Sequence, residues 1–286
     1  MVSIKKILKS HLVLGPQWGY GKSKNLTLGP TDWYKIAPQC AGTAQSPIDL
    51  DCYSLKSNIW KETLAIDFDN EGGLVVGSFT NNGHSPTLAI EKSLGSATLS
   101  GGPVGDTVFQ LEQFHFHFGC SSFQGSEHTV SGSSYPVEAH FVFYNTSYTD
   151  FARAADKADG LTVVGAFFEL GSEPNGILSR LKSKFEMIVA EGRSVPVVET
   201  DKIFLKDLVP AFNNGSPYYT YQGSLTTPPC FESVRWIVLS ETAPFSPSQL
   251  IMFNRLQSST GYGDGKMCNN FRPVQPRKGR DVFLIY

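Results

Sequence analysis

Three of the six histidines are spaced so that they could bind one metal ion. His115 and His117 lie two residues apart in the run Phe-His-Phe-His-Phe at 114–118. In an extended strand alternate side chains share a face, so the two imidazoles point one way and the three phenylalanines point the other way, into a core. His140 follows 23 residues after His117 and can lie beside the pair if the chain returns antiparallel. Three neutral imidazoles leave the fourth position of a tetrahedral Zn2+ open for water, which is typical of catalytic zinc sites.

Two further polar residues lie on the same strand faces as these histidines. Gln113 precedes His115 by two residues, and Glu138 precedes His140 by two. Each of these side chains can accept a hydrogen bond from an imidazole and so orient it toward a metal. The alternative is that His115 and His117 are ordinary strand residues with polar partners. The grouping favours zinc, but it does not name a reaction.

The elements that would position these residues are mostly strands. Alternating or buried apolar patterns predict strands within 73–90 (two strands around a polar turn), 108–118, 137–144, 161–170 and 234–239. Apolar residues at helical spacing predict a helix over 177–188, and Ser246 followed by Pro247 predicts the start of another. Strands and helices do not alternate regularly. The predicted fold class is therefore mostly β with a few short helices, built on a large sheet.

Composition and charge exclude several classes of protein. The chain has 286 residues, of which 17% are charged, and its net charge is −2. This balance disfavours a disordered protein and a coiled coil, and we expect no nucleic-acid partner. Since no run of about 18 apolar residues is present, we also expect no transmembrane segment.

The N-terminus differs in character from the rest of the chain. Residues 1–15 form a basic tail in which lysines interrupt any continuous apolar core, so the tail does not resemble a signal peptide. A frayed end, a weak transit peptide and a membrane-surface helix are the alternatives for it. We expect residues 16–286 to form a single domain.

Motifs along most of the chain resemble those of the α-class carbonic anhydrases. Each motif is weak alone, but their order is specific, and together they extend from Trp18 to the end of the chain. They are Trp-Gly-Tyr-Gly at 18–21, Gln-Ser-Pro-Ile-Asp at 45–49, Asn-Asn-Gly-His at 81–84, the run 113–119, Gly-Ser-Glu-His-Thr-Val at 125–130, Glu-Ala-His at 138–140, Tyr-Gln-Gly-Ser-Leu-Thr-Thr-Pro-Pro at 221–229 and Asn-Phe-Arg-Pro-Val-Gln-Pro at 270–276.

This resemblance implies an activity and a more detailed fold. The activity is that of a carbonate dehydratase, a zinc lyase that catalyses the reversible hydration of CO2 to bicarbonate and a proton by attack of zinc-bound hydroxide on CO2. The fold would be a mainly antiparallel, twisted central sheet with the Zn2+ at the bottom of a cleft. Sulfonamide-type compounds would inhibit such an enzyme. Its role would lie in pH control, inorganic-carbon transport or biomineralization.

The resemblance also implies roles for individual residues at the matching positions. The zinc ligands would be His115, His117 and His140, and their orienting acceptors would be Gln113, Glu138 and the backbone of Asn270. The catalytic residues would be Thr226, which accepts a hydrogen bond from the hydroxide, Glu127, which takes the proton of Thr226, and His84, which exports protons with the ordinary pKa of a histidine.

Two further groups of residues match the surroundings of the family's site. Waters on the proton path would be ordered by Tyr20, Asn82 and Thr87. The substrate pocket would be lined by Val142, Val163, Leu225, Thr227, Val234 and Trp236.

The cysteines and possible glycosylation sites bear on the compartment. By the resemblance, Cys40 and Cys230 form the disulfide of the family's secreted members, which implies a secreted or extracellular protein. Spacing does not assign partners to the other three cysteines, and an intermolecular bridge is one alternative for them. Three glycosylation sequons begin at Asn25, Asn145 and Asn214, which would suit a secreted glycoprotein.

Two alternatives to a CO2-hydrating enzyme belong to other functional classes. One is a catalytically weak scaffold or mineral-matrix protein that reuses the fold, and the other is a zinc esterase. The sequence retains all three histidines that match zinc ligands, which disfavours the scaffold. The small valine-lined pocket favours a small apolar substrate over an ester. The sequence does not predict the oligomeric state.

Overall fold

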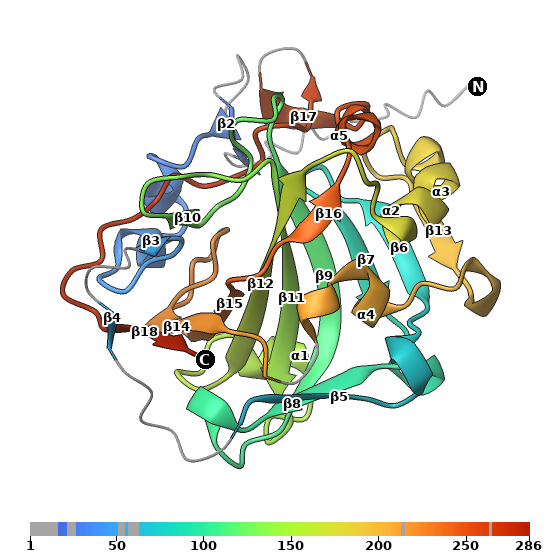
Figure 1. Cartoon of the computed structure of the whole chain (residues 1–286). Helices are drawn as coiled ribbons and strands as arrows, with labels where there is room; N and C mark the ends of the chain where they lie inside the picture. Colours follow the sequence, from blue (N-terminus) through green and yellow to red (C-terminus); the bar gives the residue numbers. More distant parts are fainter. Residues whose placement is uncertain (1–16, 22–26, 51–54, 57–62, 213–214, 263–264) are drawn as a thin grey trace, which may run out of the picture.

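A central sheet of thirteen strands organises the computed structural model, which describes residues 17–21, 27–50, 55–56, 63–212, 215–262 and 265–286. Figure 1 shows this sheet crossing the molecule, with helices packed along one side of it. The strand order is β13 (Ser194–Val197), β6 (Gly77–Asn81), β7 (Pro86–Ile90), β9 (Phe109–Phe118), β11 (Val137–Asn145), β12 (Leu161–Leu170), β15 (Val234–Leu239), β14 (Tyr218–Gly223), β18 (Val282–Ile285) and β4 (Leu55–Lys56).

Smaller elements complete the chain. Three strands pair beside the main path: β16 (Ala243–Phe245) with β12, and β5 (Ala65–Phe68) with β8 (Ala97–Ser100), which also pairs with β9. Two parallel pairs lie apart from the sheet, β1 (Gln17–Trp18) with β2 (Thr27–Leu28) and β3 (Asp49–Leu50) with β10 (Thr129–Val130). The remaining strand is β17 (Gln257–Tyr262), and short 3-10 turns occur at Trp33–Lys35, Pro38–Ala41, Glu71–Gly73, Lys92–Leu94, Gly102–Val104, Glu199–Asp201 and Pro210–Phe212.

The sheet confirms the predicted fold class. Most neighbouring strands pair antiparallel, while β15 and β16 pair parallel to β12, and β4 pairs parallel to β18. The predicted strands over 161–170 and 234–239 have the bounds of β12 and β15. The two strands expected around a polar turn are β6 and β7. The boundary expected between residues 15 and 16, together with the basic tail, lies outside the described residues.

Five short α-helices are present among the described residues: α1 (Phe151–Ala154), α2 (Gly176–Arg180), α3 (Lys182–Met187), α4 (Leu205–Leu208) and α5 (Pro247–Phe253). The apolar repeat over 177–188 predicted one helix, and the structure divides it into α2 and α3 at Leu181. Leu181 closes α2 and opens α3, because its N donates to Ile177 O and its O accepts from Phe185 N, both at 2.9 Å. The predicted start of α5 is confirmed, and Ser246 N there donates to Gln249 Oε1.

The two faces of β9 have opposite environments, as its alternation predicts. Phe114, Phe116 and Phe118 are all fully buried in the main hydrophobic core. His115 and His117 lie on the other face, where a second apolar cluster surrounds Trp236. Packing of the three phenyl rings therefore fixes the strand from behind while its histidines face the candidate site.

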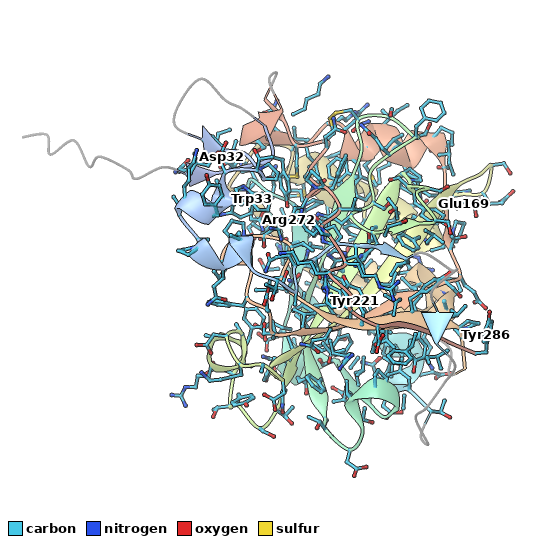
Figure 2. All side chains as sticks on the ribbon, turned by 90° about the vertical axis from the view of Figure 1, so that its left-hand side faces the viewer. Asp32, Trp33, Glu169, Tyr221, Arg272 and Tyr286 are labelled. Carbon is cyan, nitrogen blue, oxygen red and sulfur yellow. A yellow bond between two sulfur atoms is a disulfide. The ribbon has the colours of Figure 1, made fainter. Side chains whose placement is uncertain are left out.

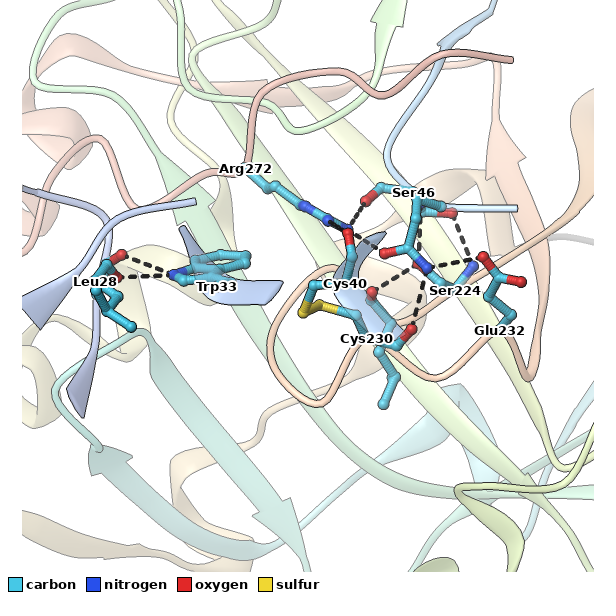
Figure 3. The surroundings of a disulfide bond; sticks show 11 residues. Leu28, Trp33, Cys40, Ser46, Ser224, Cys230, Glu232 and Arg272 are labelled. Carbon is cyan, nitrogen blue, oxygen red and sulfur yellow. Dashed lines mark hydrogen bonds between the residues drawn. A yellow bond between two sulfur atoms is a disulfide. The ribbon is translucent and has the colours of Figure 1, made fainter. Parts of the chain in front are cut away.

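Two disulfides link distant parts of the chain. The predicted bond between Cys40 and Cys230 is present, and a second one joins Cys120 to Cys268, a pairing that the sequence left open. The fifth cysteine, Cys52, lies outside the described residues. Figure 3 shows the Cys40–Cys230 bond beside Arg272, whose buried guanidinium donates to Cys40 O at 3.0 Å and to Ser46 O at 2.9 Å.

The sequon at Asn145 is a poor glycan acceptor in the folded chain. Asn145 is only 2% exposed, and its side-chain amide donates to Asp159 O at 3.2 Å. Attachment of a glycan to that nitrogen would require Asn145 to lose both its burial and its hydrogen bond to Asp159 O. The sequons at Asn25 and Asn214 fall outside the described residues. In the part of the chain that is described, every helix is too short or too polar to cross a membrane.

The packing behind β9 leads to a stability prediction. Replacing Phe116 by Ala should lower the free energy of unfolding by about 3–5 kcal/mol, because it leaves a cavity in a fully buried layer. Phe123 is 87% exposed, so Phe123→Ala is the matched control and should change stability by less than about 0.5 kcal/mol. Urea unfolding followed by circular dichroism measures both, and equal effects would contradict the assigned core.

Candidate active site

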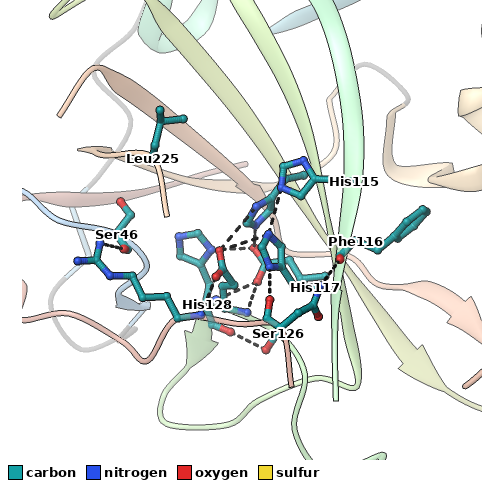
Figure 4. Close-up of polar contacts among 12 residues, drawn as sticks. Ser46, His115, Phe116, His117, Ser126, His128 and Leu225 are labelled. Carbon is teal, nitrogen blue, oxygen red and sulfur yellow. Dashed lines mark hydrogen bonds and ion pairs between the residues drawn. The ribbon is translucent and has the colours of Figure 1, made fainter. Parts of the chain in front are cut away.

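The sheet register brings the three predicted ligand histidines together. His115 on β9 lies directly opposite His140 on the antiparallel strand β11, and Glu138 lies opposite His117. One ring nitrogen from each of the three histidines lies within 4.8 Å of the others, and Nε2 of His115 is 3.1 Å from Nε2 of His117. Figure 4 shows the rings of His115 and His117 directed toward this cluster from the same strand.

The other nitrogen of each ring faces an acceptor. Nδ1 of His115 lies 3.0 Å from Gln113 Oε1, Nδ1 of His117 lies 2.7 Å from Asn270 O, and Nε2 of His140 lies 2.8 Å from Glu138 Oε1. Amide, carbonyl and carboxylate oxygens only accept, so each of these ring nitrogens carries a proton. The remaining nitrogen of each neutral ring then presents a lone pair toward the common centre.

Burial keeps these imidazoles neutral, and this decides whether they suit a metal. It lowers the pKa of His117 to about 3, and it also lowers the pKa values of His115 and His140. A metal ligand must be the unprotonated imidazole, so the three rings already have the required form at neutral pH. Three convergent nitrogen donors with their outer nitrogens engaged fit Zn2+.

Glu138 is the anionic centre of a second, hydrogen-bonded group behind the ligands. Its Oε1 accepts from His140 and from His128 Nδ1, and its Oε2 accepts from the backbone N–H groups of Glu127 and His128, all at 2.7–2.8 Å. Burial alone would raise the pKa of Glu138, but the two histidines hold it below its usual value. Because all of these oxygens are engaged, the group of His128, Glu138 and His140 is a hydrogen-bond network and not a second metal site.

Glu127 and Thr226 lie on the ligand side of this network. One oxygen of Glu127 accepts from Arg272 N at 2.7 Å, and the other lies 3.5 Å from His117 Nε2. Burial raises the pKa of Glu127 well above its usual value, whereas the Arg272 N–H and the Thr226 side chain lower it. Thr226 is itself buried. The expected pair is therefore brought to the edge of the histidine cluster.

The residues predicted to line the substrate pocket form one apolar wall. Val142, Val163 and Trp236 occupy matching positions on β11, β12 and β15, where each lies opposite the next. Val234 and Leu225 belong to the same apolar cluster, and Thr227 is half-buried nearby in sequence. Trp236 Nε1 donates to Ser224 O at 3.0 Å, which satisfies the only polar atom of that side chain. The wall therefore offers an apolar surface next to the three histidines.

Comparison with known proteins identifies this arrangement. The family model of eukaryotic-type carbonic anhydrases matches residues 28–286. The chain belongs to this family. Human carbonic anhydrase 7 is 39% identical to it over 268 residues, which cover 93% of this chain and 96% of that relative. The protein is accordingly a carbonate dehydratase, a lyase that uses Zn2+ and acts on a small-molecule substrate.

In this carbonic anhydrase the predicted proton shuttle is stacked under a tryptophan. The ring of His84 lies 3.7 Å from that of Trp18 at an angle of 10°. Burial lowers the pKa of His84 to about 4, while the Glu191 carboxylate acts in the opposite direction. The expected ordinary pKa is therefore wrong for this position of the ring, because packing against Trp18 and its surroundings leaves the imidazole only partly exposed to water.

The loop that carries His84 is organised by Asn82. Asn82 Oδ1 accepts from the backbone N–H groups of His84 and Ser85, and its amide donates to Thr87 Oγ1 at 3.1 Å. Thr87 in turn lies opposite His115 in the sheet. Asn82 and Thr87, two of the three residues predicted to order waters, are therefore hydrogen-bonded to each other and connect the His84 loop to the strand position opposite His115.

The third predicted residue of the proton path, Tyr20, lies among tryptophans. Its ring is 5.9 Å from that of Trp18 and 5.7 Å from that of Trp33. Burial, together with the Glu127 carboxylate, raises the pKa of Tyr20 well above its usual value. Its hydroxyl therefore stays protonated at neutral pH.

Sequence reasoning did not single out Trp18 and Arg272, although both lie in quoted motifs. Arg272 is 2% exposed, and Figure 2 shows it within the molecule near Trp33 and Tyr221, whereas Tyr286 lies at the periphery. Its guanidinium lies over the Trp33 ring at 5.6 Å. An arginine between Phe271 and Pro273, in a segment matched to the site through Asn270, was the available signal.

The stacking of Trp18 on His84 predicts that removal of the indole changes the pKa of His84. Trp18→Ala should raise the pKa of His84 from about 4 toward 6.5, because the imidazole regains contact with water. Titration of the histidine ring protons by NMR measures this value. Tyr34→Ala changes an exposed aromatic residue of the same N-terminal region and should leave the pKa of His84 unchanged. An unaltered value in Trp18→Ala would show that other groups bury His84.

Proposed function

We propose that His115, His117 and His140 bind the Zn2+ and that the residues around them catalyse CO2 hydration in the roles expected from the family. The observation that carries this proposal is the convergence of three neutral imidazoles, each with its outer nitrogen bonded to an acceptor. When bound, Zn2+ supplies a Lewis acid that lowers the pKa of a coordinated water, an effect for which carbonic anhydrase is itself the standard example.

Glu127 and Thr226 would orient the reacting oxygen. Because Arg272 N occupies one oxygen of Glu127, the other is left for the Thr226 hydroxyl. Thr226 would donate its only proton to Glu127, so its lone pairs would face the histidines. A hydroxyl used in this way can only accept, and it selects a reacting group that has a proton to donate.

The apolar wall would select the substrate. Val142, Val163 and Trp236 offer an apolar surface without free hydrogen-bonding groups, since the indole N–H of Trp236 is bonded to Ser224 O. A small molecule without net charge or dipole would rest there beside the reacting oxygen, because leaving water for an apolar surface costs it little. We expect sulfonamide-type inhibitors to occupy the same place.

His84 would export the proton released in each cycle. Its stacked position disfavours protonation, since its pKa there is about 4. Proton transfer would therefore use a position in which the ring leaves Trp18 and regains water, with Asn82, Thr87 and Tyr20 ordering the waters between. Rotation of one side chain would then accompany each transfer.

We further propose that the enzyme is secreted. Two disulfides, Cys40–Cys230 and Cys120–Cys268, support this proposal, because such bonds persist in oxidising compartments and are rare in the cytosol. The buried Asn145 sequon adds no support.

The zinc assignment predicts a loss of metal and activity together. Purified enzyme should hydrate CO2 rapidly in a stopped-flow assay, lose this activity on chelation and regain it with Zn2+. His140→Ala should weaken zinc binding by more than about 100-fold, because even residues that only orient a ligand contribute 10- to 100-fold. His84→Ala is the control and should keep its zinc. Tightly bound zinc without hydration in the unaltered enzyme would favour the scaffold or the esterase.

The shuttle assignment predicts a separate kinetic effect. In weak buffer, His84→Ala should lower kcat by about tenfold or more, since a general acid–base group contributes at least about 100-fold when nothing replaces it. The value of kcat/KM should stay unchanged, because proton export follows the chemical step, and added imidazole should restore kcat. An unchanged kcat would mean that another proton route dominates.

A further inference from the structure

One end of β9 is bordered by an irregular segment instead of a strand. β7 pairs with β9 only from Gln113 to His115. Beyond His115 the same edge of β9 is bonded by Asn269 and Asn270, which lie outside helix and strand. His117, whose ring reaches toward the zinc site, is located in this part of β9.

The side chain of Asn270 takes the place of a neighbouring strand at this edge of β9. Its Oδ1 accepts from Phe118 N at 2.8 Å, and its amide donates to Phe116 O at 2.9 Å and to His84 O at 2.9 Å. Asn269 N donates to Phe118 O at 2.8 Å. The backbone oxygen of Asn270 can meet His117 Nδ1 at 2.7 Å only while this segment stays against the strand.

The Cys120–Cys268 disulfide lies at the start of this contact. Cys120 follows His117 by three residues, and Cys268 precedes Asn270 by two. Cys120 N also donates to Asn269 Oδ1 at 3.0 Å. The covalent bond therefore joins the end of the ligand strand to the segment that supplies both the acceptor for His117 and, through Arg272 N, a donor to Glu127.

We propose that the Cys120–Cys268 disulfide is a positioning element of the zinc site, which holds the segment of Asn270 and Arg272 against the strand of His117. Without it, separation of this segment would leave His117 Nδ1 without its acceptor, and the ring would lose both its tautomer and its orientation. Zinc would then leave faster, although none of its ligands had been changed. This inference rests on the proposed zinc site.

The second disulfide provides a matched control. Cys40–Cys230 spans 190 residues and Cys120–Cys268 spans 148, so loss of either bond should relax the unfolded chain to a similar extent. Cys230 N, however, bonds to Thr227 O, and Cys40 O accepts from the Arg272 guanidinium at 3.0 Å. This disulfide therefore borders the Thr226 loop and the Arg272 side chain, whereas Cys120–Cys268 adjoins Asn270, the acceptor of His117. General destabilisation would therefore lower the melting temperature of both double variants, whereas loss of positioning would speed zinc release only in the variant without Cys120–Cys268.

The experiment compares the full-length enzyme with C120S/C268S and C40S/C230S. Release of zinc into excess pyridine-2,6-dicarboxylate is followed by metal analysis, and the visible spectrum of the cobalt-substituted enzymes reports the ligand geometry. C120S/C268S should release zinc about tenfold faster than the unaltered enzyme or more, and its cobalt spectrum should change. C40S/C230S should melt at a similarly lowered temperature but release zinc at the unaltered rate.

If C120S/C268S fails to fold, the same disulfide can instead be reduced in the unaltered enzyme after it has folded. Cys120 is exposed, although its partner Cys268 is buried, whereas Cys40 and Cys230 are both buried. A water-soluble phosphine can therefore attack the Cys120 sulfur and should reduce the Cys120–Cys268 bond first. The disulfide gains two electrons and two protons, and the phosphine becomes its oxide with oxygen from water. Faster zinc release after reduction, reversed by reoxidation, would support the proposal.

Two results would overturn the proposal, and a third concerns the zinc site itself. Zinc release from C120S/C268S, or from the reduced enzyme, within twofold of the unaltered rate would remove the positioning role. Equal acceleration in both double variants would assign the effect to general destabilisation. If the unaltered enzyme bound no zinc at all, the proposed zinc site would fail first.

Discussion

The proposed zinc site depends on keeping three imidazoles neutral and correctly oriented in a buried place. Burial favours the neutral ring, but a neutral ring has two tautomers, and only one of them directs its lone pair to the common centre. The acceptors at Gln113, Asn270 and Glu138 select that tautomer. Glu138 would be costly as a lone buried carboxylate, so His128 and two backbone N–H groups must surround it. The network behind the ligands follows from this requirement.

The rest of the fold supplies this arrangement by two different means. The sheet places His115 opposite His140 and anchors β9 through phenylalanines on its other face, so regular hydrogen bonding determines where these histidines lie. The donor to Glu127 and the acceptor for His117 come instead from an irregular segment. Such a segment has no strand ladder to hold it, and here side-chain amides, a buried arginine and a disulfide take over that function.

Local patterns were sufficient for much of the fold and for picking out the three histidines that converge. The alternation in 114–118 predicted which side chains enter the core, and the buried runs at 161–170 and 234–239 predicted two strands with their observed bounds. The repeat at 177–188 predicted a helix but not the division at Leu181, since apolar spacing is the same on both sides of that residue. The partner of Cys120 could not be predicted from spacing, because two cysteines 148 residues apart meet only through the tertiary fold.

By itself, the sequence determined the class of fold, the three histidines and the family, because strand periodicity and short motifs are local properties of the chain. Only the tertiary structure decided how those residues are tuned. It brought Asn270 to His117 across 153 positions, joined Cys120 to Cys268, and placed Trp18 over His84 so that burial lowers the pKa of that imidazole. Desolvation and hydrogen-bond partners depend on what lies nearby in space, and the neighbours of these side chains come from distant parts of the chain.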